Sequence, residues 1–149
     1  MRLAPALGAA LALLLALPAA AAQGSKYDYD ALGSEFCRVT LAGDMAGLRP
    51  LISDDLARAI EAAAARARVL PPQTLFQSYT NPVPLCEAHT RNAALVEIRR
   101  SGPGGGPAWS EYLVIVPQLD GTNRVDDILF ATRRSDTLRS RLAVFASGG

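Results

Sequence analysis

The chain has 149 residues, of which 15 are lysine or arginine and 14 are aspartate or glutamate, so its formal net charge at pH 7 is +1. A chain of this length builds one domain around a single hydrophobic core. The balanced charge gives no electrostatic attraction to nucleic acid or to an anionic membrane, so neither is expected as a partner.

The N-terminus has the pattern of a secretory signal peptide. A short basic start precedes an apolar run as far as Leu17, and small residues follow, so an Ala-x-Ala site fits cleavage after Ala21 or after Ala22. The alternative is an uncleaved membrane anchor, because the run approaches the roughly 20 residues that cross a bilayer. Cleavage is favoured, since much of the run is alanine, which is only weakly apolar and makes a poor membrane anchor. Cleavage predicts that 1–22 is removed and that 23–149 forms a single periplasmic or secreted domain with no membrane contact.

Cys37 and Cys86 are the two cysteines of the chain. In an oxidising compartment, a lone pair within one domain is most economically a disulfide. The alternative is reactive chemistry, because the single histidine, His89, follows Cys86 closely and suggests a nucleophilic pair or a metal site. Zinc needs three or four ligands, and apart from Cys86 and His89 the chain offers only one further cysteine or histidine, Cys37. A catalytic thiol must stay reduced, whereas thiols oxidise in this compartment. The disulfide is therefore favoured, and no metal or cofactor is expected.

Helical periodicity dominates the chain after the signal. An apolar stripe predicts a helix over 27–42, and a short turn over 45–48 follows Asp44. Ser53 is placed to cap a second long helix, which Pro71 closes. The predicted buried face of that helix consists of Leu56, Ile60, Ala63, Ala64 and Ala67.

Strand patterns dominate the second half. The predicted strands are 75–79, 92–99, 109–117 and 124–132, with a hairpin turn at Asp120-Gly121 and a last helix capped by Ser135 or Asp136. The strand 109–117 is apolar on both faces, so it is expected inside the sheet. Helices followed by antiparallel strands indicate an α+β fold: N-terminal helices packed on one face of a curved antiparallel sheet, with a short C-terminal helix.

The segment 119–128 reads Leu-Asp-Gly-Thr-Asn-Arg-Val-Asp-Asp-Ile. This segment and the order of the elements resemble the cone-shaped α+β superfamily of nuclear transport factor 2, ketosteroid isomerase and scytalone dehydratase. Its final strands often carry Asp-Gly, an aromatic residue, and then Arg–aliphatic–Asp–Asp–aliphatic. Asn123 stands where tryptophan is usual. The resemblance implies a sheet that curves into a cone.

Two shorter motifs resemble small exported bacterial domains of unknown function within that superfamily. They are Phe36-Cys37 in the first helix and Trp109-x-x-x-Leu113-Val114 in the central strand. Members of the superfamily often pair through the exposed face of the sheet, so the resemblance also implies a homodimer formed through that face.

The resemblance implies where an active site would lie. Enzymes of the superfamily use the mouth of the cone, where a carboxylate acts as base and a tyrosine or histidine polarises the substrate. Such a carboxylate needs an apolar pocket that raises its pKa. Adjacent strand residues point to opposite faces of the sheet, so at most one of Asp126 and Asp127 enters the cone. The alternative role of the two carboxylates is structural: hydrogen bonding at the end of the strand and pairing with Arg124 or Arg99. The candidates are Asp127, Glu97 and Asp126 as base, and Tyr112, Tyr79 and His89 as polariser.

Three functions compete. The favoured one is a non-enzymatic exported domain that binds a small ligand or an envelope protein, since no convergent catalytic set stands out. The second is an isomerase or dehydratase with Asp127 or Glu97 as base and Tyr112 assisting. The third is an envelope inhibitor or immunity protein acting through the loop 81–84 or 102–107. The candidate ligand-pocket residues are Phe36, Tyr79, Trp109 and Tyr112, for which plain packing is the alternative.

Overall fold

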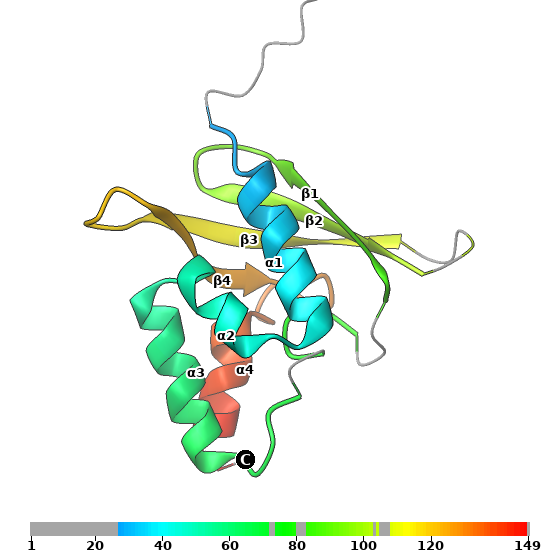
Figure 1. Ribbon diagram of the computed structural model, residues 1–149. Coiled ribbons are helices and arrows are strands. Elements are labelled where there is room, and N and C mark those ends of the chain that lie inside the picture. The colour runs from blue at the N-terminus through cyan, green and yellow to red at the C-terminus, as the bar shows by residue number, and fades with distance from the viewer. Residues whose placement is uncertain (1–26, 72–73, 80–82, 103, 105–107, 149) are drawn as a thin grey trace, which may run out of the picture.

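The computed structural model describes residues 27–71, 74–79, 83–102, 104 and 108–148, so the expected signal peptide lies outside the described residues. The fold is α+β, as predicted, with helices before an antiparallel sheet and one helix after it (Figure 1). The helical elements are α1 (Asp30–Ala42), α2 (Met45–Leu48), the 3₁₀ turn η1 (Arg49–Leu51), α3 (Asp54–Arg66) and α4 (Leu138–Ala146).

The sheet is an antiparallel meander with the strand order β1-β2-β3-β4. Its strands are β1 (Leu85–Thr90), β2 (Leu95–Ser101), β3 (Ala108–Pro117) and β4 (Asn123–Leu129). The helix α1 lies across β1 and β2, while α3 and α4 lie together beside β4 (Figure 1). The prediction that 109–117 lies inside the sheet is confirmed, because β3 pairs with β2 and β4.

Helix termini follow local capping rules. The Ser53 hydroxyl accepts a hydrogen bond from the Leu56 N–H and caps α3, as predicted. The prediction that Ser135 or Asp136 caps α4 is wrong: Thr137 does so, in a reciprocal pair with Ser140. Asp136 instead pairs with Arg141 in the first turns of α4.

The predicted buried face of α3 needs two corrections. Leu56, Ile60 and Ala63 are buried as predicted, and so is Ala57, but Ala64 is exposed and Ala67 is only half-buried at the C-cap. Positions 57 and 64 lie on the same side of the helix, so their burial differs because of their place along it: 57 lies in the first turns and joins the core, whereas 64 lies in the last turn.

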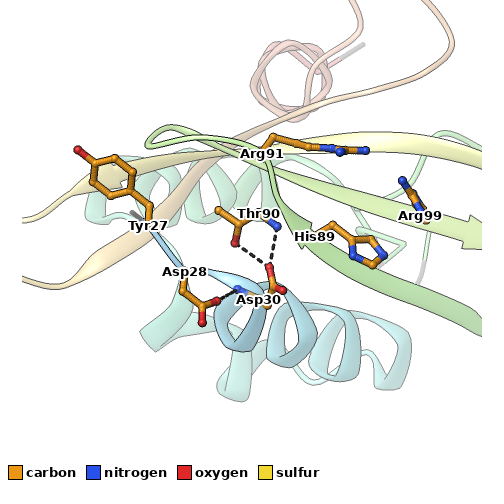
Figure 2. A pocket seen from close by; sticks show the side chains of 7 residues that line it. All are labelled: Tyr27, Asp28, Asp30, His89, Thr90, Arg91 and Arg99. Carbon is orange, nitrogen blue, oxygen red and sulfur yellow. Dashed lines mark hydrogen bonds between the residues drawn. The ribbon is translucent and has the colours of Figure 1, made fainter. Parts of the chain in front are cut away.

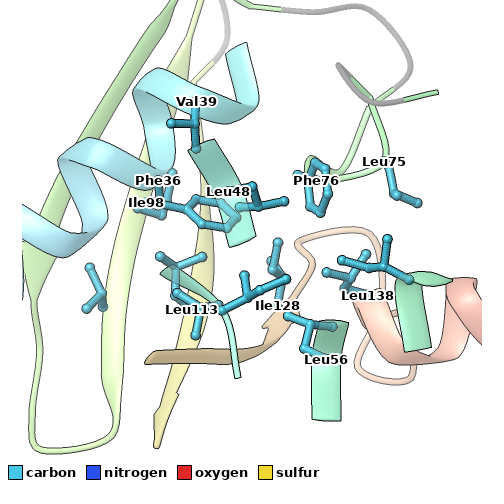
Figure 3. Close-up of a cluster of buried hydrophobic side chains, with 14 of the residues drawn as sticks. Phe36, Val39, Leu48, Leu56, Leu75, Phe76, Ile98, Leu113, Ile128 and Leu138 are labelled. Carbon is cyan, nitrogen blue, oxygen red and sulfur yellow. The ribbon is translucent and has the colours of Figure 1, made fainter. Parts of the chain in front are cut away.

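The hydrophobic core lies between the helices and the inner face of the sheet (Figure 3). Val96 and Ile98 of β2 and Leu113 of β3 point into it from the sheet, as the alternation in 92–99 predicts. Side chains from every helix meet them, including Phe36, Val39, Leu48, Leu56 and Leu138.

The structure differs from the prediction around the first strand. The segment 75–79 forms turns, so the prediction of a strand there is wrong. The strand β1 was not predicted, and His89 lies in it rather than in a loop. β1 sits at the sheet edge with few buried side chains, so it lacks a strong apolar alternation.

A disulfide joins Cys37 of α1 to Cys86 of β1, with their Cα atoms 5.8 Å apart. The predicted pairing is therefore present. It fixes the edge strand to the helix that covers it, across 49 residues of sequence. An intramolecular disulfide is compatible with an oxidising compartment outside the cytosol.

A buried ion pair lies on the inner face of the sheet. The Arg100 Nε donates to Glu111 Oε2 at 2.7 Å, and the two residues are 2% and 0% exposed. Arg100 also donates to the Phe76 carbonyl at 3.0 Å, while Glu111 Oε1 accepts from the Ser78 N–H and, at 3.1 Å, from the Trp109 indole. The pair therefore fixes the segment 76–78 as turns against the sheet.

Replacing Arg100 alone tests the importance of this pair. Arg100→Met leaves the Glu111 carboxylate buried without its cation, so we expect the free energy of unfolding to fall by about 3–5 kcal/mol in urea titrations. Arg100→Met with Glu111→Gln removes both charges and keeps an acceptor for Ser78, so it should recover much of that loss. Arg38→Gln, at an exposed pair on α1, should change stability by less than about 0.5 kcal/mol. A single Arg100→Met variant as stable as the parent protein would contradict this account.

Candidate functional site

A groove opens where the start of α1 meets the end of β1. Its volume is about 470 Å³, and polar and charged side chains dominate its lining (Figure 2). The lining residues are Tyr27, Asp28, Asp30, His89, Thr90, Arg91 and Arg99. They come from two segments about sixty residues apart and from the neighbouring strand β2.

Hydrogen bonds between α1 and β1 hold one wall of the groove. Asp30 Oδ1 accepts from the Thr90 N–H at 2.6 Å and from the Thr90 hydroxyl at 2.7 Å. The Tyr29 N–H donates to the same hydroxyl at 2.8 Å, and Asp28 Oδ1 accepts from the Asp30 N–H. The Thr90 hydroxyl and N–H lower the pKa of Asp30 below its usual value, with a small contribution from His89. The Asp30 carboxylate is therefore ionised and fixed in place.

A second cluster lies on the outer face of the sheet, around Glu97 of β2. Glu97 is 5% exposed, and its Oε1 accepts from the Ser110 hydroxyl at 2.6 Å. Its Oε2 accepts from Arg91 Nη2 and lies 3.3 Å from Arg99 Nη2. The Ser110 hydrogen bond, followed by those of Arg99 and Arg91, outweighs burial and lowers the pKa of Glu97 to about 2. Glu97 is thus ionised at neutral pH and positions two arginines at the groove.

His89 also lines the groove. It pairs in register with Glu97 across β1 and β2. Its Nε2 lies 3.8 Å from Glu87 Oε2, beyond hydrogen-bond distance, and has no hydrogen-bond partner among the described residues. The imidazole is therefore held beside the arginines by strand geometry rather than by a bond of its own.

The candidate bases Asp126 and Asp127 make strand-end contacts. Asp126 Oδ1 accepts from the Ser53 hydroxyl at 2.5 Å and from Arg139 Nη2 at 2.6 Å. Asp127 Oδ1 accepts from the Ile128 N–H at 2.8 Å and from the Arg139 N–H at 3.0 Å. These bonds tie the starts of α3 and α4 to β4. Their partner is Arg139, not the Arg124 or Arg99 that the sequence suggested.

The strands bring two predicted pairs of base and polariser into register: Glu97 with His89 across β1 and β2, and Glu97 with Tyr112 across β2 and β3. Glu97 and Tyr112 lie on the outer face of the sheet, away from the core. A carboxylate whose pKa lies near 2 is a weak base at neutral pH, because general-base catalysis works best when the pKa lies near the working pH. The environment of Glu97 therefore suits an electrostatic anchor better than a proton acceptor.

The four residues expected to form an aromatic pocket lie in three places. Phe36 is fully buried in the core, edge-on to Phe76 with ring centroids 6.0 Å apart. Tyr79 and Trp109 form an edge-to-face pair with centroids 4.7 Å apart, and Tyr79 is half-exposed. Tyr112 lies on the opposite face of β3 from Trp109, because strand side chains alternate.

Neither a cluster of metal ligands nor a membrane-spanning helix occurs among the described residues. No three histidine, cysteine, aspartate or glutamate side chains among the described residues gather closely enough to hold a metal ion. None of the described helices is long and apolar enough to span a bilayer.

The groove residues Asp28, Asp30, Thr90 and Arg91 were not identified from the sequence. Their association depends on contacts between α1 and an edge strand that was itself not predicted. A usable signal is present only for the hairpin, where Arg91 and Asn92 begin the short connection 91–94 between two segments that pair.

Comparison with known proteins adds no relative: no family model matches the chain, and no curated protein or solved structure is significantly similar to it.

The lowered pKa of Glu97 predicts acid sensitivity. A carboxyl whose pKa falls from 4.5 to about 2 on folding contributes stability above pH 4.5, which is lost as the pH falls from 4.5 towards 2. Because both arginines are about half-exposed, the contribution is on the order of 1–2 kcal/mol. Urea titrations from pH 7 to pH 2.5 should show a shallower acid decline in Glu97→Gln than in the parent protein. The exposed Glu61→Gln of α3 is the matched control, and equal acid declines in all three proteins would refute the role of Glu97.

Proposed function

We propose that this chain is an exported, non-enzymatic binding domain that holds a small polar ligand in the groove between α1 and β1. The observation that carries the proposal is the convergence of fixed charged groups on one concavity. Asp30 is held by Thr90, and both Arg91 and Arg99 are held by Glu97. Ligand sites in proteins typically combine such a concavity with a few polar groups in fixed positions.

The interior of the fold is a poor site for a ligand. Arg100 and Glu111 point inwards from the sheet and are fully buried, and Phe36 and Phe76 pack beside them. A ligand that entered between the sheet and α1 would have to displace this ion pair, which is costly to break. This packing favours a site on the outside of the sheet over one in a cone.

Export is supported by two independent features. The N-terminal pattern is that of a cleaved signal, and the disulfide between Cys37 and Cys86 suits the periplasm or the extracellular medium. A relationship to the nuclear transport factor 2-like superfamily remains part of the proposal. It rests on the segment 119–128 and on the packing of helices against one face of an antiparallel sheet.

An isomerase or dehydratase is the second candidate, because Glu97 and Tyr112 are neighbours across β2 and β3. The low pKa of Glu97 counts against it. Asp127, the other proposed base, uses an oxygen to hold the start of α4.

A protein partner or a second copy of the chain is the third candidate. The outer face of the sheet carries Tyr112, Val114 and Val116 of β3, which are half-buried, and Leu129 of β4, which is exposed. An open apolar sheet face favours association with another surface. The loops expected for an inhibitor, 81–84 and 102–107, lie largely outside the described residues.

The export proposal predicts the mass of the mature protein. Protein produced in a bacterial host with a periplasm and recovered from that compartment should begin at Ala22 or Gln23 and carry no free thiol. Intact mass spectrometry with and without alkylation measures both. An intact Met1, or two alkylated cysteines without prior reduction, would contradict export with an oxidised pair.

The groove proposal predicts that small polar compounds bind there. A library of small metabolites, screened by ¹H–¹⁵N chemical shifts, should contain compounds that shift the amides of Asp30, Thr90 and Arg91. Arg99→Gln should weaken those shifts, whereas Arg38→Gln on the far part of α1 should not. Compounds that shift only the outer face around Val114 would favour a partner surface instead. A library that moves no groove amide would defeat the proposal.

A further inference from the structure

The two arginines of the groove share one buried carboxylate. A guanidinium carries five N–H donors, and within the described residues Arg91 and Arg99 each direct one nitrogen at Glu97 Oε2. The three side chains together carry a net charge of +1. Both arginines are about half-exposed and line the groove, so most of their donors are available to a ligand.

Such a pair is suited to an anionic group. Guanidinium groups bind carboxylate or phosphate through parallel N–H bonds, which are stronger than hydrogen bonds between neutral groups. Long arginine side chains normally lose conformational freedom when they bind. Here Glu97 already holds both, so this ordering is partly complete before a ligand arrives.

The opposite end of the groove has the reverse charge. In Figure 2, Arg91 and Arg99 lie towards one side and Asp28 lies towards the other, while Asp30 lies between them, below Thr90 and next to His89. Both aspartates line the groove, and within the described part of the chain each accepts hydrogen bonds at one carboxylate oxygen, Oδ1. This end accepts hydrogen bonds from an amine and repels a second anion.

We propose that the groove binds a small zwitterion, with its carboxylate or phosphate on Arg91 and Arg99 and its ammonium group facing Asp28 and Asp30. The inference rests on the proposed binding function and specifies the chemistry of the ligand. Glu97 acts as a positioning residue, because it contacts the arginines rather than the ligand. A polyanion such as nucleic acid would meet the Asp28 and Asp30 carboxylates, which repel it.

Three probes of matched length test the proposal: 4-aminobutyrate, succinate and 1,4-butanediamine, which are a zwitterion, a dianion and a dication at pH 7. Titrations are followed by ¹H–¹⁵N shifts of Thr90, Arg91 and Asp30 at constant ionic strength, with sodium chloride as the reference. We expect 4-aminobutyrate to bind at least about tenfold more tightly than either other probe. Arg99→Gln should weaken its binding about tenfold, the loss expected for a charge-assisted hydrogen bond. Arg38→Gln should leave it unchanged.

The variants also separate positioning from folding. Glu97→Gln should weaken 4-aminobutyrate binding while preserving the dispersed spectrum of a folded protein, and Asp28→Asn should reduce the preference for the zwitterion over succinate. Equal binding of all three probes, or binding that survives in Arg91→Gln/Arg99→Gln, would overturn the inference. Groove shifts caused only by butanediamine or by an uncharged library compound would also overturn it, yet would leave the proposed binding function standing.

Discussion

The buried ion pair between Arg100 and Glu111 is the constraint on which the rest of the fold depends. Two charges are placed in a hydrophobic core, where each needs a partner and further hydrogen bonds. They find these in each other, in the backbone of Phe76 and Ser78, and in the Trp109 indole. The segment before β1 must therefore follow a turn path, and the space between sheet and helices is filled by the chain's own side chains.

The same two strands place a second charged cluster on their other face. Strand alternation turns Arg100 and Glu111 inwards and Arg99 and Ser110 outwards, so β2 and β3 carry polar networks on both sides. The inner network is closed and structural. The outer one, around Glu97, is open to solvent at its arginines and borders the groove. This asymmetry is the reason for placing function outside the sheet.

Much of the fold follows from local patterns in the sequence. α1 and α3 follow from apolar stripes and from the Ser53 cap, β3 from its continuous apolar run, and the disulfide from the compartment that a signal peptide implies. The local composition of the segment 75–79 predicts a strand, because it contains no sign of the distant residues Arg100 and Glu111 that hold this segment in turns. The groove was also missed. It depends on hydrogen bonds between Asp30 and Thr90, and no local pattern identifies such a distant pair.

We propose that the Arg100–Glu111 network closes the interior, so that binding takes place at the outer groove. Hydrogen exchange of two protons measures this directly: the Ser78 amide and the Trp109 indole N–H, which both donate to Glu111. Their exchange should be slow and should approach the rate set by global unfolding. Rapid exchange of both in the folded protein would show an interior open to water, and would return the candidate site to the space between sheet and helices.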